Sequence, residues 1–168
     1  MKNHEWEHNL KQQIPNLRRY ARALTKNATC ADDLVQDCLE RGWNKRNSWA
    51  PGSNLRAWLF TIMHNLYVNG IRRQQMHQNF LDESTTSQIA HDNDKSYLVR
   101  DLEVCLSRLK PEYREVIILA GLENLSYKEI ALITDTPIGT VMSRLSRGRE
   151  ELRQLMSGTG KAKLVSVK

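Results

Sequence analysis

The chain has 168 residues, enough for one medium domain or two small ones, and its 25 Lys and Arg against 19 Asp and Glu give a net charge of +6. This modest basic excess is compatible with nucleic-acid binding but does not indicate it alone. Cys30, Cys38 and Cys105 form no CxxC pair and have no histidine at metal-ligand spacing, so we expect buried, reduced thiols, no metal site and no cofactor. No apolar run is long enough for a signal peptide or a membrane span, so we expect a soluble cytoplasmic protein without membrane insertion.

Two helices are predicted near the N-terminus. The first covers Leu10–Thr25, with Pro15 in its first turn, and has an apolar face of Leu17, Tyr20, Ala21 and Leu24. The polar residues 27–30 interrupt the helical pattern, and Thr29 is suited to cap the next helix. That second helix has its own apolar face, which consists of Leu34, Val35, Cys38, Leu39 and Gly42.

The opposite face of the second helix carries Asp33, Gln36, Asp37 and Glu40. These four residues include no basic i+4 partner among them, and their carboxylates repel one another. Solvation is the usual fate of such a face, but a basic partner surface would explain the clustering. Residues 32–40 contain four acids and no base, whereas residues 41–73 contain six bases and no acid, so opposite charges are expected on neighbouring elements.

A polar loop is expected over 45–53, where Pro51-Gly52 interrupts regular structure. The helix that follows, 54–73, has the spacing of a buried stripe formed by Leu55, Trp58, Leu59, Ile62, Met63 and Leu66. A flank of the same helix carries Asn54, Thr61, Asn65 and Arg72. Together with Trp49 in the loop, these groups suit single-stranded nucleic acid, whose bases stack on aromatic rings and expose hydrogen-bonding edges. Trp58, at the edge of the stripe, fits the protein core equally well.

Residues 79–96 are polar and acidic and predict a flexible interdomain linker. Two helices follow it and are separated at Lys110-Pro111. Their apolar faces are Leu98, Leu102, Cys105, Leu106 and Leu109 in the first, and Tyr113, Val116, Ile117 and Ala120 in the second. Gly121 is suited to end the second helix in a left-handed conformation. At the C-terminus we expect a frayed basic tail over 157–168.

The stretch 125–152 has the pattern of a helix-turn-helix. Ser126 and Glu129 have the spacing of a capping box, and Leu125 and Ile130 have that of a hydrophobic staple. These signals predict that a helix of about two turns begins here and buries Ile130.

The residues Asp135-Thr136-Pro137 end that short helix, since Thr136 can cap a second helix and Pro137 suits its first position. In the second helix the apolar residues that can face inward are Ile138, Val141, Leu145 and Leu152. Those that point elsewhere are Thr140, Ser143, Arg144 and Arg147. Hydroxyls and arginines on one helix face suit contact with phosphates and base edges in DNA. For this stretch alone, the alternative is an ordinary solvated helical hairpin.

Four motifs occur in one order along the chain. They are Asp32-Asp33-Leu34-Val35-Gln36-Asp37, Leu55-Arg56-Ala57-Trp58-Leu59-Phe60, Leu125-Ser126-Tyr127-Lys128-Glu129-Ile130-Ala131, and Pro137-Ile138-Gly139-Thr140-Val141 with Ser143-Arg144-Leu145. Over about residues 10–155 the chain resembles the extracytoplasmic-function (ECF) sigma factors, which are small bacterial transcription initiation subunits. The resemblance implies an all-α protein with two small helical domains, a region-2 domain at 8–78 and a region-4 domain at 97–156, joined by the acidic linker. The region-4 domain would be a four-helix unit that contains the helix-turn-helix.

The resemblance also implies partners and site residues. Core RNA polymerase, through the clamp helices of its largest subunit and its flap, would bind Asp33, Gln36, Asp37 and Glu40. A second set of residues would melt the minus-10 promoter element and capture one of its bases. This set consists of Arg46, Trp49, Ser53, Asn54, Arg56, Trp58, Thr61, Asn65, Arg72 and Arg73. The minus-35 element would be read in the major groove by Thr140, Met142, Ser143, Arg144, Ser146 and Arg147. An anti-sigma factor commonly holds free members of the family.

We therefore expect a promoter-specificity subunit that is not an enzyme, because no nucleophile–base pair, metal cluster or phosphate loop is evident. A free-standing helix-turn-helix regulator is one alternative, and it would need neither the acidic face nor the melting helix. A sigma mimic that captures an anti-sigma protein is another, although Arg144 and Arg147 argue against it. The sequence departs from the family pattern at Met142, where many relatives have a basic residue. It also has Thr134-Asp135 at the turn, which we expect to form because Asp tolerates left-handed conformations.

Overall fold

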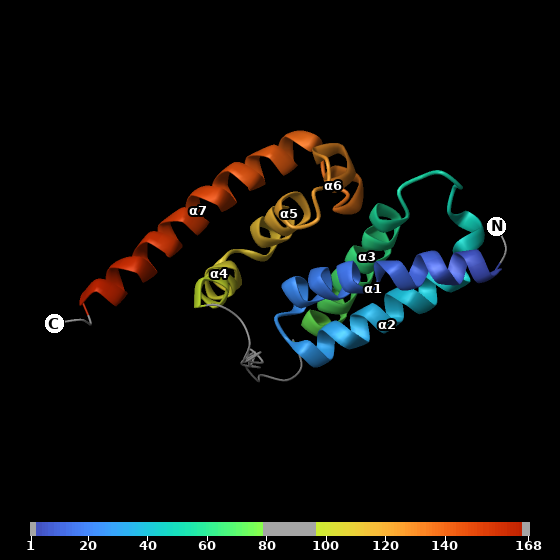
Figure 1. Cartoon of the computed structure of the whole chain (residues 1–168), viewed down its shortest axis with the longest axis horizontal. Helices are drawn as coiled ribbons and strands as arrows, with labels where there is room; N and C mark the ends of the chain where they lie inside the picture. Colours follow the sequence, from blue (N-terminus) through green and yellow to red (C-terminus); the bar gives the residue numbers. More distant parts are fainter. Residues whose placement is uncertain (1–2, 79–96, 166–168) are drawn as a thin grey trace. The chain divides into compact units, whose positions relative to one another are not determined.

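A computed structural model describes residues 3–78 and 97–165, and within these ranges every regular element is helical (Figure 1). The elements are α1 (Asn3–Thr25), α2 (Ala28–Asn44), a 3-10 turn η1 (Arg46–Ser48), α3 (Leu55–Gln78), α4 (Tyr97–Arg108), α5 (Pro111–Gly121), α6 (Tyr127–Ile133) and α7 (Ile138–Val165). The predicted all-α fold with two helical regions is confirmed, whereas the predicted linker at 79–96 lies outside the described residues. None of the described helices combines the length and apolar character that crossing a membrane requires.

The chain divides into two compact units, and in the first the helices α1, α2 and α3 surround an aromatic core. In α1, Leu17 and Tyr20 are fully buried, and the Tyr20 ring lies 4.7 Å from the ring of Phe60 in α3. The Tyr67 hydroxyl donates to the Leu24 carbonyl oxygen at 3.0 Å and so joins α3 to the C-terminal end of α1. Aromatic side chains therefore connect the first and third helices.

The predicted apolar face of α2 is buried in this bundle, as Leu34, Val35 and Cys38 show. At Gly42 a Cβ atom would lie 2.9 Å from Cδ2 of Leu59. The absence of a side chain at Gly42 therefore lets α2 and α3 approach closely.

The first helix is longer than the sequence analysis predicted. It begins at Asn3 rather than at Leu10, so the exposed Pro15 lies inside a 23-residue helix and not in its first turn. Proline removes one backbone donor from a helix, which favours a helix end. Here the helix continues because Trp6 and Leu17, on the two sides of the proline, are both buried.

Two local predictions in the first unit are also corrected. Asn27, not Thr29, caps α2, because the Asn27 side-chain oxygen accepts a hydrogen bond from the Cys30 N–H at 3.0 Å. Cys30 is exposed because it lies in the first turn of α2, away from the buried face, so Cys38 and Cys105 are the two buried thiols. All three cysteines are free, as predicted.

The second unit packs α4 and α5 against α7, with α6 between α5 and α7 in the chain. Its core is mainly aliphatic and includes Cys105, Leu109, Val116, Ile118, Leu119, Leu125, Ile130, Val141 and Leu145. At Gly148 a Cβ atom would lie 2.9 Å from Cδ1 of Ile117 and 3.0 Å from Cβ of Tyr113. The helices α5 and α7 therefore cross at a residue that has no side chain.

The helix-turn-helix formed by α6 and α7 begins with the predicted capping box. The Glu129 carboxylate accepts hydrogen bonds from the Ser126 backbone N–H at 2.9 Å and from its hydroxyl at 2.8 Å, and the Glu129 N–H donates to Ser126 Oγ at 3.3 Å. Between the helices Asp135 has a φ of 48°, in the left-handed region expected for it. The second helix begins at Ile138, one residue after Pro137.

Three predictions in the second unit are wrong. Gly121 stays within α5, and Asn124 takes the left-handed conformation instead, with a φ of 50°. Ile138 is 44% exposed, because it is the first residue of α7 and no preceding turn covers it. The backbone is helical up to Val165, where a frayed tail was predicted from residue 157, and residues 166–168 lie outside the described residues.

Candidate functional site

The acidic face of α2 lies in solvent, with Asp33, Gln36, Asp37 and Glu40 all exposed. Across the described residues the three carboxylates of this set have no ion pair. Their neighbour Asp32 differs, since its carboxylate lies 3.9 Å from Arg18 Nε of α1. The face thus presents uncompensated negative charge beside one carboxylate that already has a basic partner.

Cys38, on the other side of α2, fixes the direction of this acidic face. Its thiol donates a hydrogen bond to the Leu59 carbonyl oxygen of α3 at 3.3 Å. Burial, with a smaller contribution from the neighbouring Asp37 charge, raises the pKa of the Cys38 thiol to about 12. The thiol therefore stays neutral in the core, and α2 is held with its carboxylates outward.

The loop after α2 is folded by local contacts. Arg46 is half-buried: its guanidinium donates to the Trp43 carbonyl oxygen at 3.0 Å and lies 5.3 Å from the centre of the Trp43 ring. The exposed Ser53 closes a turn through its N–H, which donates to the Ala50 carbonyl oxygen at 3.1 Å. Gly52 within that turn has a φ of 87°, which glycine adopts without strain. Arg46 is therefore engaged with α2, whereas Ser53 is accessible.

Trp49 and Trp58, the two tryptophans of the predicted minus-10 set, both contact Trp6 of α1. The Trp6 ring centre lies 5.4 Å from that of Trp49 and 6.0 Å from that of Trp58. Trp49 and Trp58 are half-buried, whereas Trp6 is only 2% exposed. Trp58 is thus partly in the protein interior and partly at the surface, and its contact with nucleic acid stays a prediction.

The remaining predicted residues of α3 fall into two groups. Asn54 caps the helix, because its side-chain oxygen accepts from the Ala57 N–H at 3.2 Å, and the half-buried Thr61 donates to the Ala57 carbonyl oxygen at 3.0 Å. Arg56 is half-buried as well. The other exposed members of the set are Asn65, Arg72 and Arg73, and the capping residue Asn54 is exposed as well.

The N-terminal half of α7 presents the predicted minus-35 residues on one surface. Met142, Ser143, Ser146 and Arg147 are exposed, and Thr140 and Arg144 are half-buried. Neither Arg144 nor Arg147 forms an ion pair with any residue that the structure describes.

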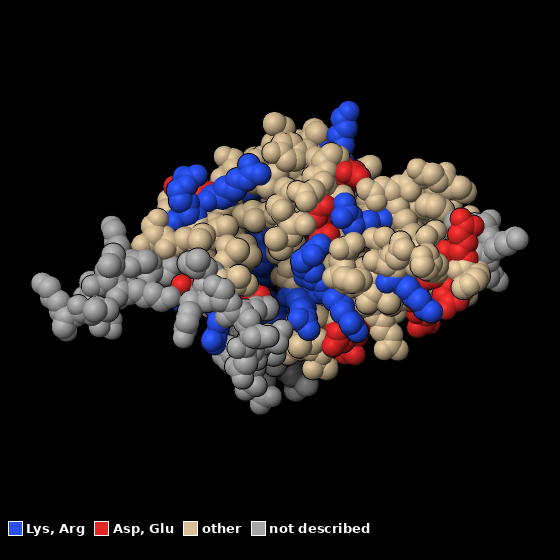
Figure 2. Space-filling view, in the orientation of Figure 1, with Lys and Arg blue, Asp and Glu red and all other residues tan. Residues whose placement is uncertain are grey.

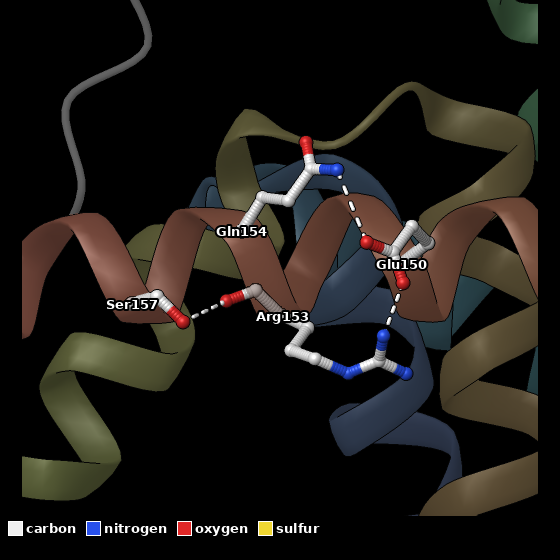
Figure 3. Close-up of polar contacts among 4 residues, drawn as sticks. All are labelled: Glu150, Arg153, Gln154 and Ser157. Carbon is white, nitrogen blue, oxygen red and sulfur yellow. Dashed lines mark hydrogen bonds and ion pairs between the residues drawn. The ribbon is translucent and has the colours of Figure 1, made fainter.

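Further along α7, Glu150 and Arg153 are paired within the helix. Figure 3 shows Glu150 bound to Arg153, and Gln154 donating to the same carboxylate at 3.1 Å. Ser157 Oγ donates to the Arg153 carbonyl oxygen at 2.9 Å (Figure 3). The arginines that are available to a phosphate therefore lie toward the start of α7.

Trp6, Trp49 and Trp58 form an aromatic cluster. The sequence analysis missed Trp6, because the first helix was expected to begin at Leu10. Two signals point to the earlier start. Trp6 and Leu10 are apolar residues four apart, which extends the buried stripe by one turn. The other signal is Glu5, which lies in the first turn of α1, where negative charge favours a helix. In the folded chain, acidic side chains gather at this end of the first unit (Figure 2).

Comparisons with known proteins agree with this arrangement. A family model described as the Sigma2 domain of PhyR matches residues 10–64, and one described as sigma-70 region 4 matches residues 100–152. The ECF RNA polymerase sigma factor EcfG of Rhodopseudomonas palustris is 36% identical over 145 residues, which are 85% of this chain and 80% of that protein. The sigma factor RpoE of Bartonella quintana, solved in complex with the anti-sigma factor NepR, has a TM-score of 0.84 at 35% identity and covers 91% of this chain and 97% of its own. The chain therefore belongs to the ECF RNA polymerase sigma factors.

Proposed function

We propose that this sigma factor binds core RNA polymerase in the cytoplasm through the acidic face of α2 and directs it to specific promoters. The residues proposed for the clamp helices of the largest subunit are Asp33, Gln36, Asp37 and Glu40. The N-terminal half of α7 reads the minus-35 element through Thr140, Met142, Ser143, Arg144, Ser146 and Arg147. The protein acts without a catalytic step of its own.

One observation carries this proposal. The exposed carboxylates of Asp33, Asp37 and Glu40 on α2 lack ion pairs among the described residues, and so does the exposed Arg147 on α7. In contrast, Asp32 and Arg153, which are also exposed, have ion pairs. Unpaired exposed charge is available to a partner of opposite sign, and it steers association over distances of about 10 Å at 0.1 M salt. Negative charge on α2 suits a basic protein surface, whereas positive charge on α7 suits DNA.

Promoter melting is proposed for the 45–53 loop and α3. Extruding a base costs a few kcal/mol, which contacts in a pocket must offset. Residues proposed to supply those contacts, or to hold the adjacent phosphates, are Arg46, Trp49, Ser53, Asn54, Arg56, Trp58, Thr61, Asn65, Arg72 and Arg73. The domains that divide these tasks are proposed at 8–78 for polymerase docking and melting, and at 97–156 for minus-35 reading.

An anti-sigma factor is the proposed partner of the free protein. Support comes from the Bartonella quintana sigma factor, whose structure was solved in complex with an anti-sigma factor. A sigma mimic that only captures such a partner is the alternative. The match of residues 10–64 to the Sigma2 domain of PhyR favours it, because the PhyR of Bartonella quintana is described as an anti-anti-sigma factor in complex with the anti-sigma factor NepR. Run-off transcription with core polymerase separates the two, because a mimic supports no initiation.

Binding to core polymerase tests the docking step. Asp33→Lys is expected to weaken the association at least about tenfold, because it places like charge against the basic partner surface. The matched control is Asp32→Lys, which makes the same charge change at a carboxylate already paired with Arg18 and is expected to change binding less than about threefold. If the unchanged protein does not associate with core polymerase and Asp33→Lys makes no difference, the result would support a free-standing helix-turn-helix regulator instead.

Binding to minus-35 variants of a promoter selected by the holoenzyme tests the reading step. Arg144→Ala is expected to cost roughly 1–3 kcal/mol and to relax specificity at one position. Arg153→Ala is the control on the same helix, because Arg153 is bound to Glu150 and should leave the specificity profile unchanged. Identical profiles for Arg144→Ala and the unchanged protein would show that the assignment of Arg144 is wrong.

A further inference from the structure

We propose that Trp6, in α1, is a positioning residue that holds the 45–53 loop against the first turn of α3, in the geometry that receives an extruded promoter base. This inference rests on the melting function proposed above. It adds a residue that lies outside the loop and outside α3, at the other end of the first unit's sequence.

The contacts of Trp6 place it between the two parts of the melting element. Its ring centre lies 5.4 Å from that of Trp49 in the loop, with the planes tilted at 52°. It also lies 6.0 Å from that of Trp58 in α3, edge to face at 73°. Trp6 is 2% exposed, so both contacts are made from inside the protein. One side chain of α1 thus sets the spacing between the loop and the start of α3.

The backbone of the loop does not supply this connection. The N–H groups of Ser48 and Trp49 donate to carbonyl oxygens three residues earlier, at 2.8 and 3.3 Å, and Ser53 does the same at 3.1 Å. In the part of the chain that the structure describes, no hydrogen bond joins residues 47–53 to α1 or α3. The loop is therefore shaped locally, and its attachment to α1 is made by the Trp49 ring.

The attachment is a packing contact rather than a polar one. The indole N–H groups of Trp6 and Trp49 are buried and have no acceptor among the described residues. Aromatic pairs in tilted or edge-to-face arrangements gain stability beyond the area that they bury. The geometry of the loop should therefore depend on the presence and size of a ring at position 6. Replacing the indole by a phenyl ring there removes no hydrogen bond.

A held loop is what base capture requires. A pocket that must offset the cost of unstacking loses its effect when its walls are displaced by about 1 Å, which can lower a rate about a hundredfold. With one side of Trp49 covered by Trp6, the exposed part of its ring is left to face a base. Trp6 therefore acts on the promoter through Trp49 and Trp58 without touching DNA.

Amide hydrogen exchange in the free, full-length chain tests the positioning. Trp6→Leu removes the ring and is expected to speed the exchange of residues 46–53 about tenfold or more, whereas Trp6→Phe keeps a ring and should change it less than about threefold. The matched control is Leu24→Ala, another core deletion in α1, about 27 Å away along the helix. It should destabilise the first unit without a selective effect on residues 46–53.

Run-off transcription with the holoenzyme tests the consequence, with a promoter that the unchanged holoenzyme selects from a random duplex library. Trp6→Leu is expected to lower initiation about tenfold or more on duplex template, and less than about threefold on the same template with a pre-melted minus-10 bubble. Trp6→Phe should restore most of the duplex activity, and Leu24→Ala should not distinguish the two templates.

The two experiments separate this inference from the function on which it rests. Unchanged exchange of residues 46–53 in Trp6→Leu, or an equal increase in Leu24→Ala, would overturn the positioning role whatever the protein does. An equal loss on duplex and pre-melted templates would also overturn it, because loop geometry would then not matter for opening. If the unchanged holoenzyme initiates nowhere, the proposed function fails, and the exchange data still decide whether Trp6 holds the loop.

Discussion

The first unit is joined by aromatic rings between distant segments, whereas the second is joined by aliphatic packing and by hydrogen bonds within its turns. The ring contacts Trp6–Trp49, Trp6–Trp58 and Tyr20–Phe60 all lie in the first unit. In the second unit the corresponding features are the Ser126–Glu129 capping box and the close helix crossing at Gly148. Two small helical bundles of similar size are thus stabilised by different means.

The difference matches the tasks proposed for the two units. A helix that reads a duplex in the major groove meets a partner that is already formed, so short turns fixed by hydrogen bonds serve it well. A loop that captures a base meets a partner that is still opening, and ring contacts hold it while allowing small adjustments. Substitutions in the first unit should therefore act over long distances, and those in the second should act locally.

Phe60→Ala should have the largest effect on stability. Phe60 is fully buried against Tyr20, and deleting a buried phenyl ring costs about 3–5 kcal/mol. Hydrogen exchange should report this loss in α1, α2 and α3, while the protection of α5 stays within a few tenths of a kcal/mol. A comparable loss of protection in α5 would show that the two units unfold together, which would break the comparison.

Alkaline pH should weaken the first unit through Cys38. The pKa of its thiol is raised by burial from 9.0 to about 12, so its contribution to stability is complete below pH 9 and is lost as pH rises toward 12. The free energy of unfolding should fall by up to about 1.4 kcal/mol per pH unit in that window. Cys38→Ala should lack this slope in urea titrations at pH 9, 10 and 11. Parallel curves for the two proteins would mean that the thiolate is not excluded from the core.

The sequence predicts well whatever is decided by nearby residues. The two faces of α2 follow from helical periodicity, and the capping box at Ser126 and Glu129 follows from a spacing of three. Asp135 takes its left-handed conformation for a reason that lies in its own side chain. The all-α fold is therefore readable from the chain, as is the helix-turn-helix.

The sequence predicts poorly whatever depends on a distant partner. Trp49 shows no helical register, and only the folded chain brings Trp6 against it. Arg46 is of a type that suits a phosphate contact, yet its guanidinium lies over the Trp43 ring. Asn54 likewise serves as a helix cap. Sequence patterns identify which residue types gather near the melting element, but not which of them are already engaged by the protein.

Adding a methyl group at each of the two helix crossings should change the stability of the two units by different amounts. Gly148→Ala would place Cβ 3.0 Å from Cβ of Tyr113, an atom fixed to its backbone. We expect the free energy of unfolding to fall by about 1–3 kcal/mol. The higher helix propensity of alanine should offset up to about 1 kcal/mol of this loss. Gly42→Ala meets only the far end of the Leu59 side chain and should be nearly neutral.

Gly70→Ala controls for helix propensity in this pair. Nothing lies within 4 Å of its would-be Cβ, so the substitution should stabilise α3 by up to about 1 kcal/mol. Thermal unfolding of the three variants gives the comparison. A larger loss of thermal stability in Gly42→Ala than in Gly148→Ala would reverse the comparison, because the rigid helix crossing would then lie in the first unit.

The smallest effect is expected from removing one helix cap in each unit. Ser126→Ala and Asn27→Ala each delete a side-chain oxygen that accepts a backbone N–H, at 3.3 and 3.0 Å, and each should cost about 1 kcal/mol. Their consequences should differ in extent. The helix α6 has seven residues and depends on its cap, whereas α2 has 17 residues and a buried face that holds it when the cap is lost.

Hydrogen exchange should therefore rise throughout α6 in Ser126→Ala, but only in the first turn of α2 in Asn27→Ala. Ser157→Ala is the control, because its hydroxyl donates to a carbonyl on α7 and caps no N–H group. If Ser126→Ala also weakens minus-35 binding, the cause is the loosened α6, since Ser126 itself lies outside the reading surface. The comparison would be contradicted if exchange rose throughout α2 in Asn27→Ala but not throughout α6 in Ser126→Ala. Local hydrogen bonds would then matter more in the first unit, which we describe as joined by aromatic rings.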